Sequence, residues 1–206
     1  MAEFIYWVGM AAVAVNALTG VLEAERKEVD LVGACFVAVA TALGGGTVRD
    51  LLLDRKVFWI ADQTYLVTAV VVGIASFFLL RQRSIPPRWF LFPDAIGLAL
   101  FTMIGTQVAL HWGTPWLAAS LMGVITGVFG GVVRDVLCNE IPLVMRVGEL
   151  YATAAWLGAL LLIGLQWAGV PEVWASNIAL VFILALRMAA IRYRLRLPSL
   201  PVRRDG

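Results

Sequence analysis

The sequence is poor in the residues on which catalysis and metal binding depend. Charged residues make up 15% of the 206 residues, and the chain has one histidine and two cysteines. It contains no nucleophile–base pattern, metal-ligand cluster, phosphate-binding loop or cofactor motif, so the sequence predicts neither an enzyme nor a bound cofactor or metal. Cys35 and Cys138 lie in apolar stretches without metal-ligand spacing, and we interpret them as small hydrophobic residues.

The beginning of the chain also lacks the pattern of a cleaved secretory signal. Met1-Ala2-Glu3 carries no basic residue, and no small-residue cleavage site follows the first apolar run, residues 4–22. This run is long enough to cross a bilayer, so we interpret it as a transmembrane helix.

Apolar residues dominate the chain instead. They make up 61% of it, and the mean hydropathy is +0.88, which is too apolar for a soluble domain of this size. We therefore predict an all-α integral membrane protein with one transmembrane domain, residues 1–191, and a basic tail, residues 192–206. The predicted spans are residues 4–22, 30–53, 64–80, 92–110, 115–137, 149–168 and 172–191. Tryptophans near span ends are typical of an aromatic belt: Trp59, Trp89, Trp112, Trp116, Trp167 and Trp174.

The positions of the basic residues predict the orientation. When the turns between spans are assigned alternately to two sides, one side receives only Arg55 and Lys56. The other side receives Arg26, Lys27, Arg81, Arg83, Arg88, Arg146, Arg192, Arg194, Arg196, Arg203 and Arg204. By the positive-inside rule the second side is cytoplasmic, which places the N-terminus outside the cell membrane and the C-terminus inside. We interpret the tail as a topology anchor, with a nucleic-acid or anionic-lipid patch as the alternative.

One glycine-rich segment occurs twice. Gly44-Gly45-Gly46-Thr47-Val48-Arg49-Asp50 recurs 85 residues later as Gly130-Gly131-Val132-Val133-Arg134-Asp135, and upstream Val8-Gly9 matches Ile96-Gly97 at an offset of 88. Each repeat comprises three spans, over about residues 4–80 and 92–168. An odd number of spans inverts the second copy in the membrane, so the sequence predicts an inverted repeat followed by a seventh helix.

The glycines indicate a special backbone in the second and fifth spans. Three consecutive glycines favour a break or kink, although close helix packing is the alternative explanation. A broken helix frees carbonyls that attract cations, and Thr47 with Asp50 resembles a short capping box at a helix restart. We expect these two spans to line a pathway. The expected lining residues are Thr41, Gly44, Gly45, Gly46, Thr47, Thr126, Gly130 and Gly131.

The Arg-Asp pairs are costly in hydrocarbon, so we expect them to line or gate the pathway, with snorkelling at the membrane interface as the alternative. A rise of about 1.5 Å per residue places Arg49 and Arg134 about 20 Å apart, on opposite sides of the midplane. This predicts two charged layers rather than cross-pairs between Arg49 and Asp135 or Arg134 and Asp50. Adjacent helical residues point about 100° apart, so neither pair is expected to close on itself. Asp94 is the predicted partner of Arg134, and Tyr6 holds the equivalent position in the first repeat.

The two motif copies resemble the prokaryotic branch of the trimeric intracellular cation (TRIC) channel family. The resemblance rests on residues 41–53, TALGGGTVRDLLL, and 123–137, GVITGVFGGVVRDVL, and extends over nearly the whole chain. It implies a homotrimer in which each subunit has its own pore, lined by kinked second and fifth helices and conducting monovalent cations, chiefly potassium, with sodium. Phe129 departs from the motif, which often has a third glycine there. Bacterial members have also been described as putative glycine transporters.

We therefore predict a passive cation channel in which carbonyls and hydroxyls replace part of the hydration of the ion. Both arginines must then be neutralised by carboxylates, including Asp50 and Asp135. Inverted repeats are also typical of secondary transporters, so a transporter of a small solute such as glycine is the alternative. A scaffold without transport is a third possibility. The expected partners are cations, the lipid bilayer and copies of the chain, with no nucleic acid.

Overall fold

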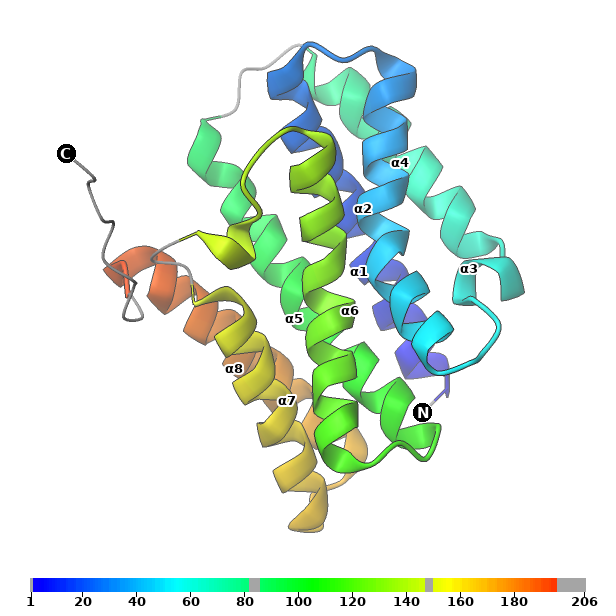
Figure 1. The fold of residues 1–206 in the computed structure, drawn as a ribbon, viewed down its shortest axis with the longest axis vertical. Coiled ribbons are helices and arrows are strands. Elements are labelled where there is room, and N and C mark those ends of the chain that lie inside the picture. Colours follow the sequence, from blue (N-terminus) through cyan, green and yellow to red (C-terminus); the bar gives the residue numbers. More distant parts are fainter. Residues whose placement is uncertain (1, 82–85, 147–149, 196–206) are drawn as a thin grey trace, which may run out of the picture.

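The computed structural model describes residues 2–81, 86–146 and 150–195, and every regular element in these ranges is a helix (Figure 1). The α-helices are α1 (Ala2–Ala24), α2 (Leu31–Leu52), α3 (Phe58–Ala61), α4 (Thr64–Leu80), α5 (Leu91–His111), α6 (Trp116–Leu137), α7 (Tyr151–Trp167) and α8 (Glu172–Tyr193). Short 3-10 helices cover Glu25–Lys27, Pro87–Phe90 and Leu143–Met145. Each of the seven predicted spans corresponds to one long helix. The sequence did not predict α3 or the 3-10 turns.

Some sequence predictions fall on other parts of the chain. Residue 149, the predicted start of the sixth span, and the basic residues Arg83, Arg196, Arg203 and Arg204 lie outside the described residues. The last helix extends to Tyr193, two residues beyond its predicted end, so Arg192 belongs to α8.

The long helices have the lengths and surfaces of membrane spans. Five of them are long and apolar enough to cross a bilayer, and α4 and α7 are shorter apolar helices of 17 residues. A bilayer core requires about 17 to 25 helical residues, so these two lie at the lower limit. Large apolar side chains are exposed on the outside of the bundle, including Phe36, Val71, Leu121 and Val181. An apolar exterior is favourable where lipid or another protein covers it.

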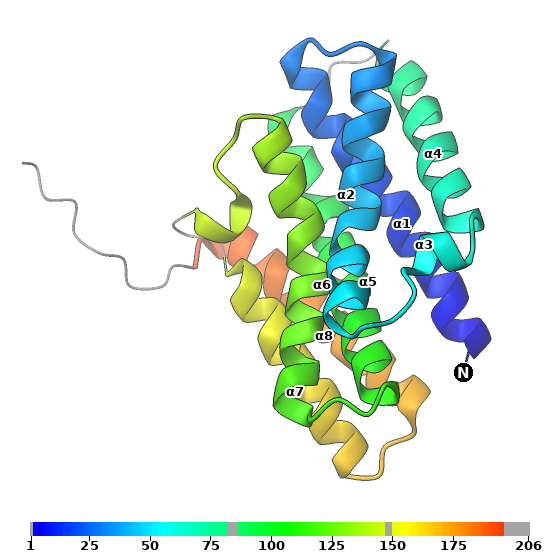
Figure 2. The same cartoon turned by 45° about the vertical axis from the view of Figure 1, so that its right-hand side comes forward.

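The two repeats meet at α2 and α6, which lie side by side and run in opposite directions in both views (Figures 1 and 2). Helix α1 packs against α2, α4 and α5, whereas α5 packs mainly against α6. Helices α7 and α8 pack against each other and against α5. The order α1-α2-α4 is thus repeated as α5-α6-α7, with α8 left over. The predicted architecture of two inverted three-helix repeats and a seventh helix is confirmed.

The glycines allow close packing between the repeats and do not interrupt the helices. A Cβ atom on Gly45 would overlap the backbone carbonyl of Thr126, and a Cβ atom on Gly130 would overlap the carbonyl of Thr41. The two contacts are equivalent, because Gly45 corresponds to Gly130 and Thr41 corresponds to Thr126 at the offset of 85. Helices α2 and α6 run unbroken through both glycine segments. The predicted break is therefore wrong, because small residues permit close approach of helices without any loss of backbone hydrogen bonds. A kink at the glycines stays a prediction.

The predicted capping box at Thr47 is also wrong. The Thr47 hydroxyl donates to the carbonyl of Leu43 at 2.7 Å, as threonines inside a continuous helix do. No helix restarts there. The helix ends instead at Leu52, just after Arg49 and Asp50.

Candidate ion pathway

Both copies of the Arg-Asp motif end a helix with the same backbone geometry. Asp54 follows α2 with a φ of 49°, and Asn139 follows α6 with a φ of 53°, at positions 85 residues apart. Aspartate and asparagine tolerate this left-handed conformation better than most residues, and it closes the last helical turn. We call the region where α2 ends the Asp50 end of the bundle and the region where α6 ends the Asp135 end.

The two aspartates hold the segments that follow these helices. An oxygen of Asp50 accepts a hydrogen bond from the backbone N–H of Phe58 at 2.9 Å, and Asp135 accepts one from Leu143 at 2.8 Å. Each donor is the first residue of a short helix, and a buried carboxylate at a helix N-terminus satisfies an otherwise unpaired N–H. Both aspartates are buried. The motif thus fixes a loop as well as neutralising an arginine.

Each arginine also pairs with the aspartate beside it. The Nε of Arg49 donates to Asp50 at 2.9 Å, and the Nε of Arg134 donates to Asp135 at 2.8 Å. The prediction that neighbours on a helix cannot pair is wrong, because the arginine side chain is long enough to turn back across the angle between them. Among the residues that the structure describes, no ion pair links Arg49 to Asp135 or Arg134 to Asp50. The expectation of two separate charged groups is confirmed.

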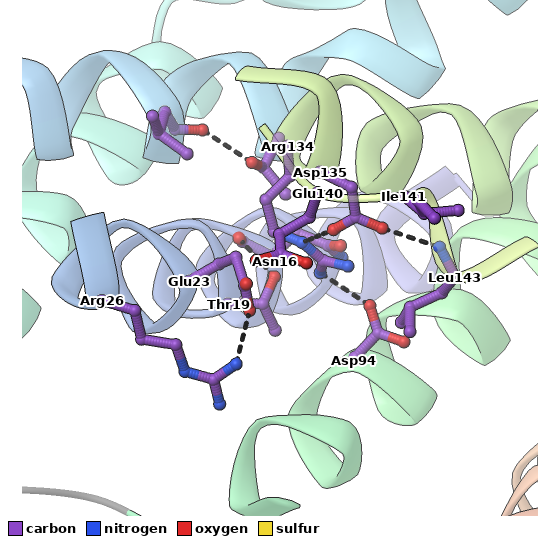
Figure 3. Close-up of polar contacts among 12 residues, drawn as sticks. Asn16, Thr19, Glu23, Arg26, Asp94, Arg134, Asp135, Glu140, Ile141 and Leu143 are labelled. Carbon is purple, nitrogen blue, oxygen red and sulfur yellow. Dashed lines mark hydrogen bonds and ion pairs between the residues drawn. The ribbon is translucent and has the colours of Figure 1, made fainter. Parts of the chain in front are cut away.

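At the Asp135 end, carboxylate acceptors surround Arg134 (Figure 3), and aromatic rings lie beside it. Its Nη1 donates to Asp94 of α5 at 2.7 Å, so the predicted partner is confirmed. Tyr151 of α7 donates to the same Asp94 oxygen at 3.2 Å, and the ring of Phe90 lies 4.9 Å from the guanidinium carbon of Arg134. Arg134 has no exposed surface. Its Nη2 and the second oxygen of Asp94 have no hydrogen-bond partner in the described part of the chain.

Helix α1 contributes a buried polar stripe that approaches the same end. Asn16, Thr19 and Glu23 follow one helical face at spacings of three and four residues, and all are buried (Figure 3). Glu23 pairs with Arg26 at 3.3 Å. Sequence reasoning missed Glu23 because the first predicted span ends one residue before it. The 3.6-residue periodicity from Asn16 to Glu23 was a usable signal.

The Asp50 end is built differently. Arg55 approaches Asp50 at 3.6 Å and lies over the ring of Trp112, 5.4 Å away, while Arg49 lies over the ring of Phe58 at 5.8 Å. Sequence analysis left the partners of Arg49 unassigned and did not single out Arg55. Tyr6, which matches Asp94, stacks edge-on against Tyr65 instead of supplying a carboxylate.

Two neighbouring cavities occupy this end. A cavity of about 130 Å³ reaches inward to Gly46, Arg49 and Phe58, and a cavity of about 520 Å³ extends to His111 and Trp112. Both are lined by Ile5, Arg55, Tyr65 and Val108. His111 and Trp112 have exposed side chains, so the larger cavity opens at the surface where α5 ends.

Buried threonines lie between the two charged ends. The hydroxyls of Thr41, Thr126 and Thr106 each donate to the carbonyl four residues earlier, at 2.6, 2.6 and 2.9 Å. All three residues are fully buried, and so is Thr102. Because the hydroxyl protons are used within the helices, the oxygens keep their lone pairs available as ligands.

Other predicted lining residues lie away from these threonines. Gly44 and Thr47 border a separate apolar cavity of about 320 Å³ that Phe129 and Val133 also line. Thr47 accepts a hydrogen bond from Trp59, and Gly131 lies against the hydroxyl of Tyr151. The structure therefore brings Thr41, Gly45, Thr126 and Gly130 together at the crossing of the repeats, with Gly44 beside Gly130, and it does not bring Thr47 there.

Comparisons with known proteins agree with this arrangement. A family model described as "Glycine transporter" matches the chain twice, at residues 6–81 and 91–167, which are the two structural repeats. The chain is 42% identical to the inner membrane protein YadS of Escherichia coli over 205 residues, covering 98% of this chain and 99% of that one. It is 40% identical to a membrane protein of Vibrio cholerae over 200 residues, covering 96% and 83%.

Solved structures decide the family. The structure of the TRIC trimeric intracellular cation channel orthologue from Rhodobacter sphaeroides superposes with a TM-score of 0.89 at 35% identity, over 93% of this chain and 99% of that one. A prokaryotic TRIC channel in 0.5 M KCl superposes with a TM-score of 0.87 at 28% identity, over 96% and 100%. The chain belongs to the prokaryotic TRIC channel family. Membership of this channel family also confirms that the chain is not an enzyme.

Two further features of this TRIC family member were missed by sequence reasoning. Arg187 lies in the last third of α8, has no exposed surface and stacks over the ring of Tyr151 at 4.7 Å. A lone arginine inside a predicted span is itself a signal of a special environment. Gln107 of α5 bonds to Ser176 of α8 at 2.7 Å and to Gln166 of α7 at 3.1 Å. This polar network ties the unrepeated helix to the second repeat.

Proposed function

We propose that the chain is a potassium-type channel for monovalent cations, with a pore inside each subunit between α2 and α6. The observation that carries this proposal is the group of buried threonines at the crossing of the repeats, with a charged group on either side. Thr41 and Thr126 occupy equivalent positions in the two repeats, and their hydroxyls lie against Gly20 of α1 and Gly105 of α5, so each half contributes one hydroxyl to the bundle interior. The similarity to TRIC cation channels supports the same function.

Threonine hydroxyls suit this role because the helices are continuous. An unbroken helix uses its carbonyls in its own hydrogen bonds, so α2 and α6 offer no freed carbonyl at the glycines. A hydroxyl that donates to a carbonyl in the preceding turn still presents two lone pairs, and oxygen ligands of this kind replace part of the hydration of a cation. We therefore assign ion coordination to Thr41 and Thr126, with Thr102 and Thr106 beside them.

The charged groups act as the two gates. Arg49 with Asp50, and Arg134 with Asp94 and Asp135, lie at opposite ends of the α2–α6 crossing, and each arginine is paired with a carboxylate. Pairing removes the repulsion that a bare arginine would exert on a cation. The described state is closed at the Asp135 end, because Arg134 has no exposed surface. Conduction requires Arg134 and Asp94 to separate or to move aside together.

The relatives and the basic residues support an assembly and an orientation for this channel. A relative is described as an inner membrane protein and a similar structure as a trimeric channel, which support a homotrimer in the inner membrane. The distribution of arginine and lysine supports an outside N-terminus and a cytoplasmic C-terminus. The Asp50 end then faces outward and the Asp135 end faces the cytoplasm. Residues 1–191 form one transmembrane domain, followed by a basic tail.

Potassium efflux from proteoliposomes tests the assignment of the threonines. The double variant Thr41→Val, Thr126→Val removes both hydroxyls while keeping the side-chain volume, and we expect it to lose at least tenfold in potassium flux. The matched control is Thr68→Val, which removes a half-buried hydroxyl in α4 that makes the same bond to the preceding turn. Wild-type flux in the double variant would overturn the assignment.

A secondary transporter of glycine is the rival function, and the description of the matching family model favours it. A transporter would show saturable uptake of radiolabelled glycine that depends on an ion gradient. It would show no unitary current. Glycine uptake without potassium flux in the same proteoliposomes would replace the channel proposal.

A further inference from the structure

The two ends of the pathway differ in their charged groups, although each is built on one copy of the same motif. Arg55 and Glu140 occupy equivalent positions at the offset of 85, and Tyr6 stands where the second repeat has Asp94. The Asp135 end gathers Asp94 and Asp135 around Arg134, and its Glu140 pairs with Lys27 and Arg146. The Asp50 end gathers two arginines around one carboxylate.

The geometry of the Asp50 end leaves its second arginine without a full partner. Asp50 is completely buried and already accepts from the side chain of Arg49 and from the backbone of Phe58. Arg55 comes no closer to Asp50 than 3.6 Å, and no described residue accepts a hydrogen bond from its side chain. About 28% of that side chain is exposed. Its donors are thus available to a ligand.

The cavities around Arg55 have walls that suit a bound anion. Arg55 lines both cavities of this end, and their walls contain no aspartate or glutamate among the described residues. Aromatic side chains make up much of the wall: Tyr6, Phe58, Tyr65 and Trp112. Apolar walls of this kind lower the local dielectric constant and strengthen the attraction between a guanidinium and an anion. The ring of Trp112 also holds the guanidinium of Arg55 in place from one face.

We propose that the two cavities at the Asp50 end bind a small anion, chloride or a short carboxylate. Arg55 is its main contact, and Arg49 lies behind Arg55. Guanidinium groups bind carboxylates through paired N–H donors and bind halides by charge alone. The bound anion neutralises the excess positive charge at the mouth of the pathway. Anion binding at this site is a function separate from ion conduction. It is measured without any ion flux, so its test does not depend on whether the protein conducts.

Bromide provides a direct probe. We expect crystals of the detergent-solubilised protein soaked in sodium bromide to show an anomalous peak beside Arg55. The peak should be absent in Arg55→Gln and present in Arg55→Lys, which keeps the charge. Lys56→Gln is the matched control, because Lys56 is the next residue, is exposed and lines neither cavity. Its peak should equal that of the wild type.

Competition in solution identifies the anion. Chloride and acetate should each raise the melting temperature of the wild type relative to gluconate, a bulkier anion, and neither should do so in Arg55→Gln. A larger shift with acetate or glycine than with chloride assigns the site to carboxylates, and the reverse assigns it to halides. A wild type without a bromide peak beside Arg55, or a peak that persists in Arg55→Gln, would overturn the proposal. Neither result depends on whether the protein conducts cations.

Discussion

Arg134 of α6 and Asp94 of α5 form an ion pair of 2.7 Å from which water is excluded, because the two residues are 0% and 2% exposed. Burying a charge is costly unless a partner is present, so removal of either member of the pair leaves the other as a buried charge without this partner. The pair also joins the two helices that pack most closely in the second repeat. It is therefore both a structural contact and the element that opening must disturb.

Asp94→Asn should destabilise the protein and loosen the closed state. We expect a loss of about 3 kcal/mol, at the lower end for a buried pair because Asp135 still neutralises Arg134. Denaturant unfolding in detergent measures the loss, and single-channel open probability should rise. The control is Glu172→Gln, which removes a partly exposed partner of His111 and should change neither quantity appreciably. Equal effects in the two variants would contradict the role of Asp94.

Alanine substitutions at the crossing glycines should distinguish two explanations for these residues, close helix packing and helix breaking. Gly45→Ala and Gly130→Ala each place a methyl group into a backbone carbonyl of the other repeat, and overpacking of this kind costs about 1–3 kcal/mol. Gly44→Ala is the control, because its methyl group would meet atoms no closer than 3.7 Å. The melting temperature of Gly44→Ala should be close to that of the wild type, and those of Gly45→Ala and Gly130→Ala should be lower. A Gly44→Ala protein as unstable as the other two would favour a backbone role for the glycines.

Each aspartate of the repeated motif should protect one specific amide. Asp135→Ala removes the acceptor of the Leu143 N–H, and Asp50→Ala removes that of Phe58. A hydrogen bond to a charged group contributes about 1.5–3 kcal/mol, so the matching amide should exchange at least tenfold faster. Hydrogen–deuterium exchange with mass spectrometry measures both segments in both variants. Each variant serves as the control for the other, and exchange that rises equally in both segments would indicate general loosening.

The contact between Lys27 and Glu140 should depend on pH. Lys27 donates to Glu140 at 2.7 Å, and this hydrogen bond holds the pKa of Glu140 below its usual value. A lowered carboxyl pKa means that the contact stabilises the fold above the usual carboxyl pKa and that the effect is lost as pH falls through the lowered value. The melting temperature of Glu140→Gln should therefore lie slightly below that of the wild type at pH 7, and the difference should disappear in acid. A difference that stays constant with pH would contradict this account.

Sequence reasoning succeeded where one local pattern decides the outcome. Span positions follow from apolar length, and the inverted repeat follows from an odd number of spans between the motif copies. The Asp94–Arg134 pair followed from placing one acidic residue at the start of α5 and one arginine near the end of α6, on the same side of the bilayer.

It failed where the outcome depends on what faces a residue. Consecutive glycines are compatible with a break or with close packing, and only the carbonyl of Thr126 opposite Gly45 distinguishes the two. Whether Arg49 reaches Asp50 depends on the flexible side chain rather than on the angle between helix positions. Arg55 looked like a loop residue because nothing local showed that Trp112, over 50 residues later, forms a wall beside it.

Single-channel recording tests the central claim most directly. Purified wild-type protein is placed in a planar bilayer under a gradient of potassium chloride, and the same experiment is repeated with Thr41→Val, Thr126→Val. A cation channel predicts unitary current steps that reverse near the potassium equilibrium potential and shrink or vanish in the variant. Absence of steps from protein that takes up glycine saturably, or a reversal potential near that of chloride, would contradict it.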